Sequence, residues 1–195
     1  PNCPHAFTPS IIRWDNKFLM SFRVIPDPKQ SFTSWIGLVW LDDNFNPIGE
    51  PQQLHLRKPG STVPSRQEDG RLVAIGDRLF LVYTDNEDIV ITRGGFRMYI
   101  AELQPDGVQF IPQNIERFSS FAGNDRKRRE KNWVPFEYYR KLLFAYSLVP
   151  HKILYPLVST GHCETFVSTE SAISWNWGEL RGGTPALLNG DHYLA

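Results

Sequence analysis

Three short segments of the chain hold the side chains that are best equipped for chemistry. They span residues 65–71, 129–136 and 179–185, and each stands just before an apolar, strand-like stretch. Together they supply two adjacent carboxylates, four cations, an amide and an aromatic ring: Glu68, Asp69, Arg66, Arg71, Lys131, Arg181, Asn132 and Trp133. An acid that protonates a leaving oxygen, beside an aromatic surface for a sugar, is what glycosidic bond cleavage requires. The surplus of cations also suits phosphate, which Arg binds bidentately and Lys as a point charge.

The two adjacent carboxylates divide between the two faces of the strand that we expect here. Side chains alternate along an extended strand, so only one of Glu68 and Asp69 can face a common site. We assign that place to Asp69. The alternative is structural, because an Asp close to an arginine such as Arg71 often caps a turn or forms an ion pair.

A repeated hairpin pattern positions these segments. An apolar strand, a tight polar or glycine-containing turn and a second apolar strand recur over residues 11–23, 72–84, 135–147 and 185–195. This pattern predicts β-hairpins. The copies align on one residue near the start of each second strand: Lys17, Arg78, Lys141 and His192. The first three copies also share an aromatic residue at a matched position: Phe22, Tyr83 and Tyr146.

Further strand-like material fills the intervals between the hairpins. Residues 36–42 resemble 98–103, and turn signals follow at 43–44 and 105–107. Each repeat thus supplies about four short strands, which is the content of a propeller blade; helix is limited to a turn near 114–121. The sequence therefore predicts an all-β fold, a β-propeller, with a β-sandwich as the competing architecture. The expected blades are 1–62, 63–124, 125–177 and, in part, 178–195.

The length of 195 residues is short for a closed ring. A propeller of four or five blades with about 60 residues each needs roughly 240 to 300 residues. We therefore expect a single, incomplete propeller domain of about three and a third blades, and a longer native protein. A native full-length chain of this size would contradict that expectation. In a propeller the starts of the innermost strands meet at one face, so the three polar segments should converge on one central funnel.

The composition fits a globular protein and excludes several classes. The 21 Lys and Arg balance the 21 Asp and Glu, and 41% of the residues are hydrophobic, which argues against disorder and against a dedicated nucleic-acid binder. No apolar stretch is long enough to span a membrane, and the His and Cys residues show no metal-ligand spacing. The charge run at 125–130 is of a kind typical of solvated loops, and residues 126–129 are interpreted in that way. Cys3 and Cys163 are predicted to be unpaired thiols in a reducing compartment, which favours the cytoplasm.

Several other residues have both a structural and a functional interpretation. Trp175 and Trp177 share one face of an expected strand, and core packing is favoured there over a sugar platform; Trp133 is the better stacking candidate. The pair at 182–183 lacks the lysine of a phosphate-binding loop and is interpreted as a place of close backbone approach. His151 is either a surface or structural histidine or, when protonated, a phosphate ligand.

Four stretches resemble a known enzyme family. Glu68–Arg71 is similar to the Glu-Asp-Pro-Arg motif of the family 130 glycoside hydrolases and mannoside phosphorylases. Residues 131–136, with the pairs 146–147 and 150–151, resemble the third-blade segment of that family, and 181–185 resembles its small-residue and proline segment in the next blade. The resemblance covers most of the chain in the right order. It implies a five-bladed propeller with a sugar site in the central funnel, within the wider group of arabinanases, levansucrases and invertases.

The resemblance also implies roles for individual residues. Asp69 matches the general acid, and Arg23 matches an arginine that contacts substrate. Phosphate is held in the phosphorylases by residues that match Arg71, Lys131 and His151. We expect further substrate contacts from the neighbours of these residues in the funnel: Glu68, Asn132, Trp133 and Arg181. Gly70 replaces the proline of the motif, which is expected to loosen the turn and shift Asp69.

We therefore expect a carbohydrate-active enzyme that cleaves a glycosidic bond, of a β-mannoside by resemblance, with inversion. Asp69 donates the proton, and water or phosphate attacks from the opposite face. Attack by water needs a base, for which Glu137 and Glu179 are the candidates. The alternative is a non-catalytic propeller that binds a glycan or a protein partner. The expected partner is an oligosaccharide or glycan, without nucleic acid or membrane, and no cofactor is expected beyond inorganic phosphate as a co-substrate.

Overall fold

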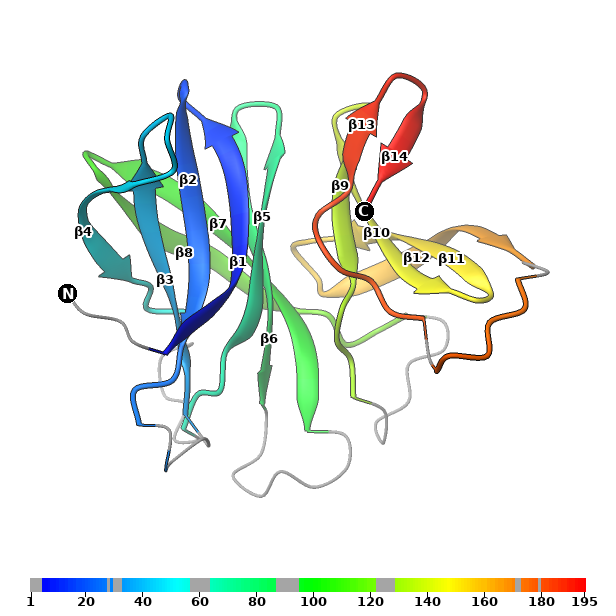
Figure 1. Ribbon diagram of the computed structural model, residues 1–195. Coiled ribbons are helices and arrows are strands. Elements are labelled where there is room, and N and C mark those ends of the chain that lie inside the picture. The colour runs from blue at the N-terminus through cyan, green and yellow to red at the C-terminus, as the bar shows by residue number, and fades with distance from the viewer. Residues whose placement is uncertain are drawn as a thin grey trace.

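The computed structural model shows an all-β chain built from antiparallel strands. It describes residues 5–27, 29, 33–56, 64–86, 95–121, 129–170, 173–178 and 180–195. Three four-stranded sheets and a separate two-stranded hairpin follow one another along the chain (Figure 1). None of the described segments forms a helix that is long and apolar enough to cross a membrane.

Each sheet is a meander whose strands pair in chain order. Sheet I consists of β1 (Ala6–Trp14), β2 (Lys17–Val24), β3 (Trp35–Leu41) and β4 (Pro47–Gln53). Sheet II consists of β5 (Glu68–Ile75), β6 (Arg78–Asn86), β7 (Phe96–Asp106) and β8 (Gln109–Arg117). Sheet III consists of β9 (Val134–Tyr138), β10 (Lys141–Leu148), β11 (His151–Leu157) and β12 (His162–Thr169). Hairpin IV consists of β13 (Leu187–Asn189) and β14 (His192–Leu194).

The four predicted hairpins are confirmed, because their signals are local. Each is closed by a two-residue turn, at 15–16, 76–77, 139–140 and 190–191. At the first turn Asp15 and Asn16 both have positive φ, of 48° and 59°, which suits the mirror-image turns that match the right-handed twist of the strands. The expected helical turn near 114–121 is wrong, because residues 109–117 continue sheet II as β8.

The sheets lie side by side, and one edge strand of each sheet lies on a common side of the molecule. The strands at that edge are the first strands of the hairpins, β1, β5, β9 and β13 (Figure 1). Adjacent edges are joined by hydrogen bonds. The Leu72 amide of β5 donates to Ser10 Oγ of β1 at 3.1 Å, and the Ala186 amide before β13 donates to the Pro135 carbonyl of β9 at 3.1 Å. This is the arrangement of propeller blades around a channel.

The core lies between neighbouring sheets rather than inside one of them. Alternate residues of sheet II point to opposite neighbours: Leu72 and Leu81 pack with Ile36 of sheet I, whereas Val73 and Val82 belong to the cluster shared with sheet III. Sheet II is therefore buried on both faces, as a blade between two others must be. Buried Cys163 of β12 belongs to the second cluster, and burial raises the pKa of its thiol to about 12; Cys3 lies outside the described residues.

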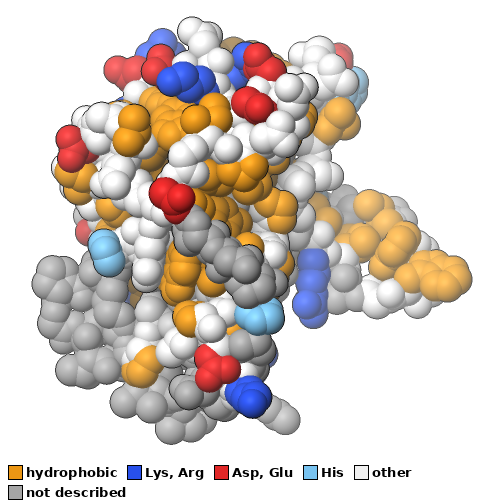
Figure 2. Space-filling view, turned by 60° about the vertical axis from the view of Figure 1, so that its left-hand side comes forward, with side chains coloured by type: hydrophobic (Ala, Val, Ile, Leu, Met, Phe, Trp, Pro, Cys, Tyr) orange, Lys and Arg blue, Asp and Glu red, His pale blue; other side chains and the backbone are white. Residues whose placement is uncertain are grey.

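The outer surface mixes polar and hydrophobic groups. Figure 2 shows hydrophobic side chains gathered in the upper part of the face that it presents. Exposed hydrophobic residues occur at the β3–β4 and β7–β8 hairpins, namely Phe45, Ile48, Val108 and Ile111. The β3–β4 and β7–β8 hairpins touch, because the Trp40 ring nitrogen donates to the Val108 carbonyl at 2.9 Å.

One expectation for the core is wrong in the structure. Trp175 and Trp177 do not share a strand face, since residues 173–178 belong to no strand, and their exposed fractions are 51% and 86%. Of residues 126–129, which were expected to be solvated, Arg129 is exposed and 126–128 lie outside the described residues. Glu130, the next residue, is buried and accepts a hydrogen bond from the Trp133 ring nitrogen at 3.2 Å.

Candidate active site

One position of the repeat recurs around a single cavity. It is the residue nine places before the second strand of each hairpin, which is Thr8, Asp69, Asn132 and Gly183 in turn. We call it the convergent position. All four residues line a cavity of about 300 Å³, together with their neighbours 9–10, 70–71 and 184–185. The predicted convergence of the polar segments is therefore seen for these residues, and we call this space the acid cavity.

The backbone at the convergent position is unusual in the same way in three of the four copies. Thr8, Asp69 and Asn132 have positive φ, of 49°, 52° and 63°. In β1 and β5 the cause is a bulge, in which two residues of the edge strand oppose one of the partner strand. A bulge re-aims the side chain that it carries, and bulges are frequent beside active sites. The residue that opposes the bulge is the matched aromatic of the repeat, Phe22 in sheet I and Tyr83 in sheet II.

Asp69 is the acidic residue of the acid cavity. Its side chain is half-buried. Burial lowers the pKa of the neighbouring Arg71, and the negative charge of Asp69 partly opposes that shift. Buried Arg71 is held by the next segment: it donates to the Trp133 carbonyl at 2.5 Å and to Asn132 Oδ1 at 3.5 Å. The cavity thus combines an acid, a guanidinium and an amide. Among the described residues that line it, Asp69 is the single carboxylate.

Gly70, next to Asp69, lies where sheets I and II pack closely. A Cβ atom at this position would lie 2.9 Å from Ile36 Cδ1 and 3.2 Å from Leu81 Cδ1, both of which are fully buried. The Gly70 carbonyl also accepts a hydrogen bond from Ser21 Oγ at 2.8 Å. The structure thus gives the glycine a packing role, and the expected loosening of the turn stays a prediction. The sheets approach each other so closely here that only glycine fits without displacing its neighbours.

Glu68 lies apart from Asp69, in a buried ion cluster. Its carboxylate contacts Arg23 NH2 and Arg66 Nε, each at 3.1 Å, and Lys131 Nζ. Burial lowers the pKa of Arg23, and the charges of Glu68 and Asp69 oppose that shift. Arg23 and Glu68 were expected to contact substrate, but they are only 8% and 4% exposed and line neither of the two cavities described here. The structure gives them a place between the sheets.

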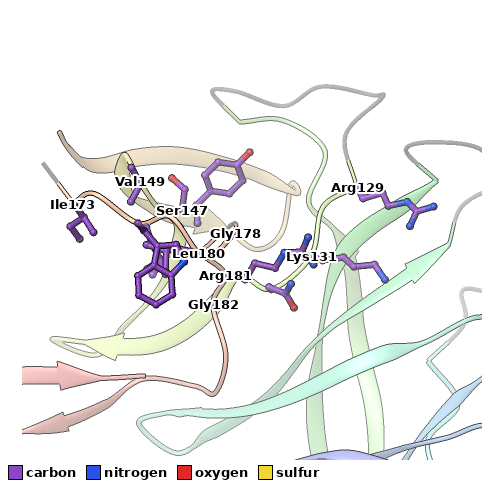
Figure 3. A pocket seen from close by; sticks show the side chains of 14 residues that line it. Arg129, Lys131, Ser147, Val149, Ile173, Gly178, Leu180, Arg181 and Gly182 are labelled. Atoms are coloured by element: carbon purple, nitrogen blue, oxygen red, sulfur yellow. The ribbon is translucent and has the colours of Figure 1, made fainter. Parts of the chain in front are cut away.

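A second and larger cavity opens beside the acid cavity. Its volume is about 600 Å³, and Asn132 lines both spaces. Three cations border it, Arg129, Lys131 and Arg181 (Figure 3), and we call it the basic cavity. Lys131 Nζ also lies 4.0 Å from the centre of the Phe96 ring, so it is held by a cation–π contact as well as by Glu68.

Two of the predicted site residues lie elsewhere. Trp133 is 1% exposed, and inside the aromatic core its ring stacks on Phe118 and meets the Phe144 ring edge-on, so the proposal that its ring carries a sugar is wrong. His151 begins β11 and pairs with Leu148, which borders the basic cavity, but it lines neither cavity itself. The three expected phosphate ligands are therefore divided: Arg71 borders the acid cavity, Lys131 the basic cavity and His151 neither.

The structure also adds residues that the sequence did not assign to the site. Ser147 and the exposed Trp175 line the basic cavity, and Thr8 and Thr184 line the acid cavity. The alignment of the repeat contained a signal for Thr8, because it holds the same place as Asp69. No local signal marks Trp175, whose place depends on how the chain crosses after β12. Gly182 is confirmed as a close approach, since a Cβ atom there would lie 2.3 Å from the Asn132 carbonyl.

At the level of sequence, neither a protein family model nor a curated protein matches the chain. At the level of structure it is similar to a putative glycoside hydrolase from Parabacteroides distasonis, with a TM-score of 0.60 and 14% identity over 97% of this chain and 60% of that one. Zg3597, a family 117 glycoside hydrolase from Zobellia galactanivorans, gives a TM-score of 0.56 and 11% identity, over 86% of this chain and 47% of that one. An alpha-L-arabinofuranosidase from Lactobacillus brevis gives a TM-score of 0.53 and 12% identity, over 89% of this chain and 60% of that one.

These similarities concern the fold. The chain spans between 47% and 60% of the length of these three proteins. They show likeness to propeller-type glycoside hydrolases and do not show membership of family 130. The chain therefore has the all-β, partial-propeller architecture of propeller-type glycoside hydrolases.

Proposed function

We propose that this protein cleaves a glycosidic bond, with Asp69 as the general acid. The observation that carries the proposal is the placement of Asp69. It is the single carboxylate among the described residues of both cavities, it stands in a bulge with φ of 52°, and it faces the place where four repeats converge. Non-glycine residues in such strained conformations cluster at functional sites, where neighbouring packing holds them.

The chemistry is proton donation to the oxygen that leaves the sugar. The Asp69 carboxylic acid transfers its proton as the bond to the anomeric carbon breaks, and a nucleophile attacks that carbon from the opposite face, with inversion. Arg71 and Asn132 border the same cavity and can position hydroxyl groups of the substrate by hydrogen bonds. The similarity to solved glycoside hydrolases supports a scaffold for this reaction. A β-mannoside remains the substrate that the sequence resemblance suggests.

Two nucleophiles are compatible with a single acid. Phosphate carries its own negative charge and needs no second carboxylate, whereas water needs a base at a suitable distance. Of the candidate bases, Glu137 lies at an exposed position of β9 and accepts a hydrogen bond from the Arg140 amide at 2.7 Å. It borders neither cavity. Glu179 lies outside the described residues. Turnover with and without inorganic phosphate separates phosphorolysis from hydrolysis.

The proposal is tested by Asp69→Asn, which removes the proton and nearly preserves the shape. We expect turnover of manno-oligosaccharides to fall by about 10² to 10⁴-fold, because that is the usual contribution of a general acid. Binding of the same sugars, measured by calorimetry, should persist. Asp106→Asn at the exposed end of β7 is the matched control and should turn over normally. Unchanged turnover in Asp69→Asn would remove Asp69 from the mechanism, and sugar binding without any turnover in the wild type would make the protein a glycan-binding propeller.

A further inference from the structure

We propose that the basic cavity binds the carboxylate of an acidic sugar, so that the natural substrate contains a uronic acid. That the ligand is a sugar rests on the proposed function; that it carries a negative charge rests on the cavity itself. Arg129, Lys131 and Arg181 border this space, and none of its described lining residues has a carboxylate. Figure 3 shows Arg181 near the middle of the cavity, with Arg129 and Lys131 to one side.

The charge balance behind the cavity wall points the same way. Glu68 is one carboxylate shared by three cations, Arg23, Arg66 and Lys131, of which Lys131 also borders the cavity. The side chain of Glu68 is 6% exposed and that of Lys131 is 26% exposed, so water screens the charges of this cluster incompletely. An anionic group in the cavity would interact favourably with the three cations that border it, Arg129, Lys131 and Arg181. Cations that are partly buried next to one another favour such an anion.

The opposite wall fits the body of a sugar ring. Ile173 and Val149 lie on the other side of the view from Arg129 (Figure 3), and Trp175, which is 51% exposed, lines the same space. Exposed aromatic rings next to polar groups provide an apolar face together with fixed hydrogen-bond partners, as ligand pockets usually do. A charged wall opposite an aromatic wall is complementary to a ring that has one carboxylate and apolar C–H faces.

The size and position of the cavity favour a sugar over a free phosphate ion. A volume of about 600 Å³ lies within the range of sites for organic ligands of several rings, roughly 300 to 1,000 Å³. A small tetrahedral anion would use the cations and leave the Trp175 wall without a partner. Asn132 lines both cavities, so a saccharide can extend from the basic cavity to Asp69.

The test measures binding by calorimetry with pairs of oligosaccharides that differ only in charge. The probes are glucuronate-, mannuronate- and galacturonate-containing oligosaccharides and their carboxyl-reduced counterparts, titrated into Asp69→Asn protein to prevent turnover. We expect at least one acidic member to bind roughly ten- to a hundredfold tighter than its neutral counterpart, the usual effect of a charge-assisted hydrogen bond. Added salt should reduce that preference.

Matched variants separate the two walls. The double variant Arg129→Gln/Arg181→Gln should lose the preference for the acidic member and keep the affinity for the neutral one. Trp175→Ala should weaken the binding of both members of a pair to the same extent. Arg13→Gln removes an exposed cation of β1 that lies over the Phe18 ring, and it should change the affinity for neither member.

Two outcomes would overturn the inference: equal affinity for both members of every pair, or inorganic phosphate displacing the sugars as strongly as the uronates do. Turnover distinguishes these outcomes from failure of the proposed function. A wild-type protein that cleaves neutral glycosides without a preference for acidic ones retains the function and loses the inference. A protein that prefers uronates but cleaves none retains the acidic-sugar site and loses the proposed function.

Discussion

Single residues at the convergent position share a backbone conformation and differ in chemistry. Thr8, Asp69 and Asn132 all have positive φ, and Gly183 completes the set around the acid cavity. The repeat therefore places a residue at the edge of the acid cavity four times, and among these four residues only Asp69 is an acid. The shared backbone gives each copy the same geometry, and the residue type at each copy sets the chemistry that is available there.

The left-handed backbone at Asp69 has a measurable effect on stability. At φ of 52° a Cβ atom costs about 1 to 2 kcal/mol unless a short polar side chain compensates. We therefore expect Asp69→Gly to be more stable than Asp69→Ala by about 1 kcal/mol in urea unfolding. At Asp106, an ordinary strand residue, the order of the same two variants should reverse, because glycine costs about 0.5 to 1 kcal/mol in extended structure. The same order at both sites would contradict the strained conformation.

Gly70 is the second residue whose replacement should be costly. Its Cβ atom would meet Ile36 and Leu81, whose side chains are both 0% exposed and have no space into which to move. We expect Gly70→Ala to lower the free energy of unfolding by about 1 to 3 kcal/mol, the usual cost of overpacking. Gly183→Ala is the control, because its Cβ atom would meet nothing within 4 Å. Equal stability of both variants would show that sheets I and II can separate at this point.

At the scale of the element, bulges decide where the polar side chains point. Strict alternation along β5 would send Glu68 and Asp69 to opposite faces. The bulge interrupts the alternation after Glu68 and before Arg71, and it directs Asp69 into the acid cavity while Glu68 remains between the sheets. The assignment of Asp69 to the site follows from the sequence, but its backbone geometry does not.

The turn between β3 and β4 carries a prediction about pH. The Asp42 carboxylate accepts hydrogen bonds from the Asn46 amide and side chain and from the Asn44 amide, and these bonds, those from Asn46 foremost, lower its pKa. The turn is therefore stabilised above the unfolded pKa of Asp42, and that contribution is lost as the pH falls through the lowered value. We expect the decline of Tm below about pH 4 to be shallower in Asp42→Asn than in the wild type.

The control for this turn is Asp43→Asn, a change of the neighbouring carboxylate. No hydrogen bond described for residues 42–46 ends on the Asp43 side chain. Its acid decline of Tm should follow that of the wild type. Identical curves for Asp42→Asn and Asp43→Asn would show that the hydrogen bonds at Asp42 contribute nothing to the pH dependence.

At the scale of the whole molecule, the ion cluster around Glu68 ties the sheets together. Its cations come from β2 of sheet I, from the segment before β5 and from the segment before β9 of sheet III. Arg71 makes a second link of this kind, from β5 to the carbonyl of Trp133. Such contacts fix the angle between neighbouring blades, and that angle determines whether the four convergent positions meet.

Removal of the central carboxylate should therefore destabilise the whole molecule. We expect Glu68→Gln to lower the free energy of unfolding by about 3 kcal/mol, because three cations then lose their partner in a buried place. Glu102→Gln breaks the more exposed pair with Arg78 within sheet II and should cost about 1 kcal/mol or less. If chemical denaturation shows equal losses for the two variants, the cluster does not hold the sheets together.

The sequence by itself determined the four hairpins and their order along the chain. Hairpins depend on alternation and on turn residues within about a dozen positions, so the four repeats could be aligned correctly from Lys17 onward. That alignment also placed Asp69 and Asn132 at one funnel.

Only the tertiary structure decided which side chains are available to a ligand. Trp133 and Trp175 are chemically alike, and the sequence favoured the wrong one, because burial depends on the sheet that packs against each ring. For the same reason Glu68 became a partner of three cations, and Lys131 and Arg71 came to border different cavities. Local pattern selects the strand, whereas exposure is set by contacts between residues that lie some 60 positions apart in the chain.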